Sequence, residues 1–412
     1  MSIEIWGQKR LRVRAESTFA TSQSVGGYEV PFVEGSLSYT MNRDMLNPSI
    51  AQSYKFNQVE KVLGQYKAEI SFSLNLCSTG TSASTGVAQL TSSTNPLGLL
   101  LKHVMGGETG ATGGTITGGT ASIPTASTLS AVPGQMVGWG TTGTAWRPVF
   151  SVGGTAFSLG LDCPSAPSGN AYAATTYYMA QDSNPNDSTS LQFYVQGAEA
   201  DDAFTIYGAA CTSFAIEVSP EGLPKLNFTF SGVAFSTYAD SWPISQGTYV
   251  ASTGFAYGKQ GAYYAASNGS TTYTASSLST EGSELFVSSE TWEPAISMQL
   301  VTAPNTNGLA GIRYVRARSA PVIKGSMRFP FQSNTFRTHW TSTNNLSFFR
   351  VIGGTPGSTI ILEAPTCQIQ SWNLVDDNGL NYQEVTWEGR NDSYTDDGGS
   401  DLERSPFRIH LG

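Results

Sequence analysis

The side chains that most often perform chemistry in proteins are scarce in this chain and are not grouped. Its histidines are His103, His339 and His410, and none has a cysteine, another histidine or a carboxylate at the spacing of a zinc site. The sequence contains neither a G-x-S-x-G nucleophile elbow nor a phosphate-binding P-loop. We therefore expect no catalytic site, no metal and no cofactor, and we predict that the protein is not an enzyme.

Two other features could suggest a bound metal, but neither has the necessary pattern. Residues 391–403 are rich in carboxylates, but Tyr394 and Asp397 occupy a ligand position and the invariant glycine position of an EF-hand calcium loop. An exposed acidic loop fits this segment better. The four cysteines form no C-x-x-C pair, and we expect them to be buried thiols of a protein made in the cytosol. They are Cys77, Cys163, Cys211 and Cys367.

Charge is distributed unevenly near the C-terminus. Every charged residue from 294 to 337 is basic, whereas nearly every one from 376 to 403 is acidic. One interpretation is that the two segments are neighbours in one domain and neutralise each other. The other is that they lie on opposite faces, so that copies of the chain stack head to tail. The sequence leaves both open.

Composition favours a folded protein built mainly of β-strands. The chain has 412 residues, of which 39% are hydrophobic, 11% aromatic and only 13% charged, and its 44 glycines are typical of turns. The net charge of −9 disfavours tight binding of nucleic acid. No signal-peptide core and no long apolar run occur, so we expect no membrane insertion.

Strict alternation of apolar and polar residues marks the clearest strands. It extends through 67–76, 213–218 and 226–230, and it predicts antiparallel strands with one buried and one wetted face. The residues expected on the polar faces are Glu69, Ser71, Ser73, Asn75, Glu217, Asn227 and Thr229.

One helix is predicted at 95–107, with Asn95 as N-cap, Pro96 in the first turn and Gly106 as the stop. Its apolar stripe includes Leu97, Leu100, Leu101 and Val104.

The second half of the chain repeats these parts. The hairpin segments 222–232 and 379–389 both begin Gly-Leu, carry Thr at the eighth place and end on Gly. Segments 293–300 and 320–331 resemble earlier strands. Segment 344–354 resembles the helix, with a stripe formed by Leu346, Phe349 and Ile352. Such an ordered repeat predicts an internal duplication.

The two copies differ by an insertion. We predict a first domain at 1–238, a Ser/Tyr/Gly-rich connector at 239–290 and a second domain at 291–412. Within the first domain, 108–200 is predicted to be a β-rich insertion that faces outward. The glycines of 106–120 are predicted to form a flexible loop at its start.

The order of these parts resembles that of the tail tube proteins of long-tailed, siphovirus-like bacteriophages. The resemblance rests on "AESTFATSQS", on the strand pair "VEGSLSYTM…KAEISFSLNL", on the helix "NPLGLLLKHVMGG" and on the hairpin "CTSFAIEVSPEGLPKLNFTFSG". It implies a mainly β fold with two tandem tail-tube-type β-sandwich or barrel domains, each with one packed helix.

The resemblance also implies a structural role in the virion. In that family six domains form a ring, so a duplicated chain is expected to form homotrimeric, pseudo-hexameric rings that stack into a hollow tube. The polar faces above become candidate lumen-facing surfaces. The implied partners are further copies of the chain, the tape measure protein and transiting double-stranded DNA in the lumen, and the tail terminator and distal tail proteins at the ends. The implied location is the virion tail, assembled in the bacterial cytoplasm.

Two long loops, 42–66 and 302–320, are candidate contacts between stacked rings. The first is unusually apolar for a loop and the second is basic. The candidate residues are Met45, Leu46, Ile50, Tyr54, Phe56, Arg313, Arg316 and Arg318. The alternative hypothesis is another virion component, such as a receptor-binding or decoration protein whose segment 239–290 contacts carbohydrate.

Overall fold

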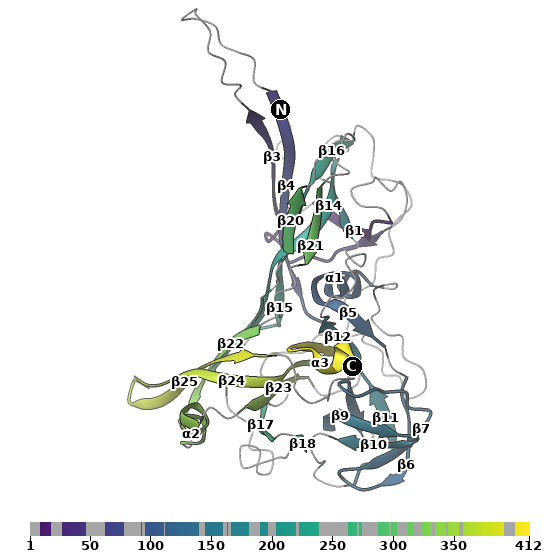
Figure 1. The fold of residues 1–412 in the computed structure, drawn as a ribbon, viewed down its shortest axis with the longest axis vertical. Coiled ribbons are helices and arrows are strands. Elements are labelled where there is room, and N and C mark those ends of the chain that lie inside the picture. The colour runs from purple at the N-terminus through teal and green to yellow at the C-terminus, as the bar shows by residue number, and fades with distance from the viewer. Residues whose placement is uncertain are drawn as a thin grey trace, which may run out of the picture.

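The computed structural model gives a mainly β, antiparallel fold with short helices (Figure 1). The structure describes residues 9–17, 27–46, 62–77, 92, 95–110, 112–139, 145–159, 163, 166–180, 190–196, 203–219, 222–238, 263–269, 272–273, 287–295, 298–302, 312–316, 323–331, 334–342, 345–353, 357–390 and 400–412.

The first half of the chain contributes four strands to one antiparallel sheet. Their order is β3–β4–β15–β14, and every pair in it is antiparallel. The register places Phe228 opposite both Phe72 and Phe214, so that the apolar side chains of three strands meet on one face. The bounds are β3 Ser38–Leu46, β4 Val62–Asn75, β14 Ala203–Val218 and β15 Lys225–Gly232.

The second half contributes four strands in a corresponding order, β19–β22–β25–β24, again all antiparallel. Ser326 and Thr386 are paired here just as Ser71 and Thr229 are paired in the first half. The bounds are β19 Ser289–Pro294, β22 Ile323–Pro330, β24 Ile360–Asp377 and β25 Leu380–Gly389.

The two four-stranded sheets are joined edge to edge. β14 pairs with β19 antiparallel, with Ile216 opposite Trp292 and Glu217 opposite Thr291. The result is a continuous eight-stranded sheet in the order β3–β4–β15–β14–β19–β22–β25–β24. We call this the eight-stranded sheet.

The long strands β14 and β24 follow the same plan. β14 pairs with β13 up to Ala209 and has a bulge after Cys211, whereas β24 pairs with β23 up to Cys367 and has a bulge after Ile369. Each residue of β14 therefore corresponds to the residue 158 places later in β24. The two strands accordingly bend out of the eight-stranded sheet at equivalent points.

Beyond these bulges the strands of each half build a second layer. In the first half β13 and β16 flank β14, and β1 and β2 extend this layer beyond β13. In the second half β23 and β26 flank β24, and β17 lies beside β23. Two strands of the first half extend this layer, because β12 pairs with β26 and β5 pairs with β12. The bounds are β1 Arg10–Ala15, β2 Tyr28–Glu29, β5 Gly106–Thr109, β12 Thr175–Met179, β13 Leu191–Gln196, β16 Ala234–Tyr238, β17 Tyr263–Gly269, β23 Leu346–Ile352 and β26 Arg408–Leu411.

A separate closed barrel is inserted between β5 and β12, and Figure 1 shows it at the end of the molecule opposite the β3–β4 hairpin. Its strands follow the order β10–β7–β6–β11–β8–β9 and enclose a core that includes Trp139 and Phe157. The bounds are β6 Gly114–Gly119, β7 Pro124–Ser127, β8 Met136–Trp139, β9 Ala145–Gly153, β10 Ala156–Leu159 and β11 Asn170–Ala173. The remaining strands are β18 Thr272–Tyr273 and the hairpin of β20 Met298–Thr302 and β21 Ile312–Arg316.

The predicted flexible glycine loop at 106–120 is wrong, because Gly106–Thr109 form β5 and Gly114–Gly119 form β6. In β5 a side chain on Gly107 would lie 2.2 Å from the ring of Tyr178 on β12. The glycine therefore lets the Tyr178 ring lie against the backbone of β5. This close contact explains why a glycine occupies a position inside a strand.

The helix predicted in the first half is confirmed as α1, Pro96–Met105. The Asn95 side chain accepts a hydrogen bond from the Leu97 amide at 2.7 Å, and Gly106 ends the helix with φ 92°. The predicted stripe residues Leu97, Leu100, Leu101 and Val104 are all buried.

The helix predicted at 344–354 is wrong. Leu346, Phe349 and Ile352 lie on the strand β23, all of whose residues are buried. A short apolar run buried on both faces carries no alternation, and its aromatic and β-branched residues favour a strand. The described helices of the second half are α2, Thr335–Ser342, and α3, Asp401–Arg404, and α3 begins with a capping box at Ser400.

The junction between β14 and β19 generates a stability prediction. Trp292 is fully buried and its ring lies 5.0 Å from that of Trp387. We expect Trp292→Ala to lower the free energy of unfolding by about 3–5 kcal/mol because it leaves a large cavity. Trp340→Ala, at a side chain that is 40% exposed, is the control and should change it by less than about 0.5 kcal/mol. Both variants are measured by urea denaturation. If they lowered the free energy of unfolding equally, Trp292 would not be a core residue of the junction.

Candidate assembly surface

The eight-stranded sheet has one apolar and one polar face. In β4 and β15 buried residues alternate with exposed or half-buried ones, as a period of two requires. All seven residues predicted for the polar faces are exposed or half-buried and lie on the same side of the sheet: Glu69, Ser71, Ser73, Asn75, Glu217, Asn227 and Thr229. The structure thus gathers residues from three separate segments onto one surface, the polar face.

Side-chain hydrogen bonds run across the strands of the polar face. Ser71 Oγ and Thr229 Oγ1 are 3.1 Å apart, and Ser73 Oγ donates to Asn227 Oδ1 at 2.6 Å. Asn227 Nδ2 in turn donates to Glu217 Oε1 at 2.7 Å. Similar hydroxyl pairs recur in the second half, Thr291–Ser326 at 2.9 Å and Ser371–Thr386 at 2.6 Å. Part of the face therefore consists of short polar groups that are bonded to each other.

The cations on the polar face of the second half lie beside carboxylates. Lys324 is opposite Glu293 on one side and Glu388 on the other. Arg328 Nη2 lies 2.7 Å from Asp377 Oδ2, and Arg328 Nε lies 3.7 Å from Glu384 Oε1. These exposed pairs add little stability, but they cancel the local charge.

This pairing decides between the two interpretations of the uneven charge for Lys324 and Arg328. Both basic residues are neighbours of residues from the acidic segment within one chain.

The eight-stranded sheet ends in two edges. In the part of the chain that the structure describes, β3 pairs only with β4, and residues 368–377 of β24 pair only with β25. We call these the β3 edge and the β24 edge. Leu374 on the β24 edge is 49% exposed, whereas Ile216, at the corresponding place in β14, is 1% exposed under Trp292. The β24 edge therefore resembles the β14 side of the β14–β19 junction, but without a strand in the place of β19.

The predicted stacking residues are only partly within the described residues. Met45 and Leu46 lie at the end of β3, and Arg313 and Arg316 lie on β21. Ile50, Tyr54, Phe56 and Arg318 fall outside the described residues. Figure 1 shows the hairpin of β3 and β4 extending away from the rest of the fold. The structure thus turns part of the first predicted loop into a projecting hairpin.

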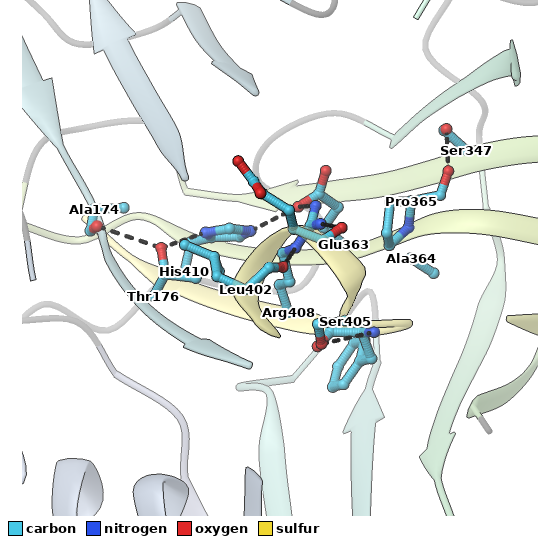
Figure 2. A network of polar contacts seen from close by, with 12 residues as sticks. Ala174, Thr176, Ser347, Glu363, Ala364, Pro365, Leu402, Ser405, Arg408 and His410 are labelled. Carbon is cyan, nitrogen blue, oxygen red and sulfur yellow. Dashed lines mark hydrogen bonds and ion pairs between the residues drawn. The ribbon is translucent and has the colours of Figure 1, made fainter. Parts of the chain in front are cut away.

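A buried polar network ties β24, β26 and β12 together (Figure 2). The fully buried Glu363 carboxylate accepts from Arg408 Nη1 at 3.1 Å and from His410 Nε2 at 3.0 Å. The hydroxyl of Thr176 lies 2.9 Å from His410 Nδ1, so a neutral ring with its proton on Nε2 satisfies both contacts. Because all of these groups are buried, we assign the network to structure.

A second buried ion pair supports the β14–β19 junction. Arg350 Nε on β23 donates to Glu290 Oε1 at 3.0 Å, and Trp292 Nε1 donates to Glu290 Oε2 at 3.1 Å. Burial raises the pKa of Glu290, and the Arg350 guanidinium opposes that shift. Neither pair was predicted, because partners 60 and 47 residues apart carry no local spacing signal.

Within the ranges given above, no three metal-ligating side chains gather into a cluster, and no helix is both long and apolar enough to cross a membrane. All four cysteines are buried, as predicted.

Comparison with known proteins found no match to any family model and no significant similarity to a curated protein sequence.

The Glu363 network predicts a pH-dependent stability. Burial lowers the pKa of His410 in the folded protein, whereas in the unfolded chain it titrates near 6.5. Below about pH 6.5 the unfolded state then binds more protons, so the free energy of unfolding falls by up to about 1.4 kcal/mol per pH unit.

The matched variant is His410→Gln, which cannot ionise. We expect it to be less stable at pH 7 and to lose less stability between pH 7 and pH 5 in urea titrations. His339 and Glu290 are unchanged in both proteins, so the difference reports His410 together with its contact to Glu363. Parallel pH profiles would refute this prediction.

Proposed function

We propose that this protein is a structural virion component, the major tail tube subunit of a siphovirus-like bacteriophage. In this proposal each half of the chain is one tube domain, and three chains form a pseudo-hexameric ring. Stacked rings form a hollow tube that conducts the phage genome into the host. The location is the virion tail, after assembly in the bacterial cytoplasm.

The observation that carries the proposal is the β14–β19 junction. It joins two similarly ordered four-stranded sheets edge to edge within one chain and leaves a strand edge at each end. Exposed edges invite pairing with another strand, and closure into a barrel removes them. Three chains with eight strands each give a barrel of twenty-four strands. Barrels of sixteen to eighteen strands already enclose an aqueous channel.

The polar face supports its assignment as the channel lining. Closing the sheet with its apolar face outward lets the second layer and the helices α1 and α2 cover that face. The lining then consists of hydroxyls, amides and carboxylates, together with paired cations such as Arg328. A net positive lining would hold DNA through its phosphates, whereas this one carries no unopposed basic cluster in its described part.

The remaining parts fit outside the channel. The closed barrel of β6 to β11 lies far from the β3–β4 hairpin in Figure 1 and suits the outer surface of a tube. The hairpins β3–β4 and β20–β21 lie in the two segments expected to contact the next ring. The partners in this proposal are the tape measure protein and double-stranded DNA inside the tube, and terminator and distal tail proteins at its ends.

Negative-stain microscopy of the purified protein at rising concentration tests the proposal. We expect rings or tubes with a central hole. Leu374→Asp should raise the concentration required for rings by at least about ten-fold, because it places a carboxylate in an apolar contact. Val152→Asp, at a residue that is 38% exposed in the inserted barrel, should assemble normally.

Both variants should keep the wild-type stability within about 0.5 kcal/mol, because both side chains are substantially exposed. Dispersed monomers of the wild-type protein at every concentration would refute the proposal. That result would favour the alternative of a receptor-binding or decoration protein. Binding of the purified protein to a glycan array would test this alternative.

A further inference from the structure

We propose a specific register for the contact between subunits: the β24 edge of one chain pairs antiparallel with the β3 edge of a second copy, with Leu374 opposite Tyr39. The inference rests on the proposed function and adds the residues that close the ring. The partner is therefore another copy of this chain.

The register comes from the junction inside the chain. β14 and β24 correspond residue by residue, so Ile216, Glu217 and Val218 match Leu374, Val375 and Asp376. Ser71 and Ser326 are equivalent, because each is paired with a threonine of the next strand. Ser38 lies opposite Ser71 and Thr291 lies opposite Ser326. Ser38 and Tyr39 are therefore the counterparts of Thr291 and Trp292. The internal pair Ile216–Trp292 therefore becomes Leu374–Tyr39 between chains.

The two edges carry residues of matching character at three of the five pairs of this register. Trp372 falls opposite Met41, and both are half-buried residues that pack against the apolar core. Asn373 falls opposite Thr40, and both are exposed. At these two pairs and at Leu374–Tyr39, apolar residues meet apolar ones on the core side and polar residues meet polar ones on the other face. The other two pairs are mixed: Val375 falls opposite Ser38, and the exposed Asp376 falls opposite the buried Leu37, just as the internal pair Val218–Glu290 joins an apolar and an acidic residue. Five consecutive opposed pairs, from Trp372–Met41 to Asp376–Leu37, follow from the register.

A shift of one residue would break this agreement. It would set Leu374 opposite Ser38 or Thr40, which belong to the polar face, so that the apolar side chains of one strand would lie on the same face as the polar side chains of the other. In the proposed register Leu374 instead loses its 49% exposure against the Tyr39 ring. The head-to-tail contact uses two different edges of the chain, so it can close a ring.

Disulfide trapping with four engineered cysteines tests the register. The full-length variants are Ser38→Cys with Val375→Cys and Thr40→Cys with Asn373→Cys, which place the thiols directly opposite each other. The mismatched variants combine Ser38→Cys with Asn373→Cys and Thr40→Cys with Val375→Cys. Each cysteine thus occurs once in a matched and once in a mismatched protein. The parent protein, whose four cysteines are buried, sets the background.

Assembled protein is oxidised mildly and examined on non-reducing gels. We expect both matched variants to form dimers and closed trimers at least about ten-fold faster than the mismatched ones, because strained disulfides cost several kcal/mol. Faster trapping in either mismatched variant would overturn the register, as would equal rates in all four. Rings seen by microscopy together with either result would leave the proposed function intact. Ladders longer than three chains from the matched pairs would support the register but contradict the three-chain ring.

Discussion

The fold depends on one constraint: the backbone amides and carbonyls at the edge of a β-sheet need partners. Inside the chain this need is met where β14 pairs with β19, and the junction is reinforced by Trp292 and by the buried pair of Glu290 with Arg350. At the two ends of the sheet, the outer sides of β3 and of residues 368–377 of β24 have no paired strand in the described structure. We propose that the two outer edges meet this need by pairing with each other between copies of the chain.

The two faces of the sheet divide the remaining tasks. The apolar face packs against the second layer and the helices. Its side chains, such as Phe72 and Phe228, are almost completely buried there. On the polar face, short side chains such as Ser71, Thr229 and Asn227 form hydrogen bonds with neighbouring strands. Where cations occur there, as at Lys324 and Arg328, carboxylates lie on the neighbouring strands. In the proposed tube, packing and passage of the genome use opposite sides of the same strands.

Much of the eight-stranded sheet could be predicted from the sequence because one of its faces is polar and the other apolar, which produces alternation along the strands. Alternation along 67–76 and 226–230 fixed the strands and the polar residues, and the Asn95 cap with Gly106 fixed α1. The prediction failed at Leu346, Phe349 and Ile352, because a strand buried on both faces carries no alternation. It also missed Glu363 with His410 and the β14–β19 junction, since pairs distant in sequence leave no local pattern.

The central claim is that each chain supplies one continuous sheet to a barrel shared by three chains. The most direct measurement is a cryo-electron microscopy reconstruction of the assembled protein, with the strands around its pore counted and traced. The account predicts three chains, twenty-four strands and a pore lined alternately by residues such as Ser71 and Ser326. A pore lined by the second layer or by the inserted barrel, or a ring in which β14 and β19 are separated, would contradict it.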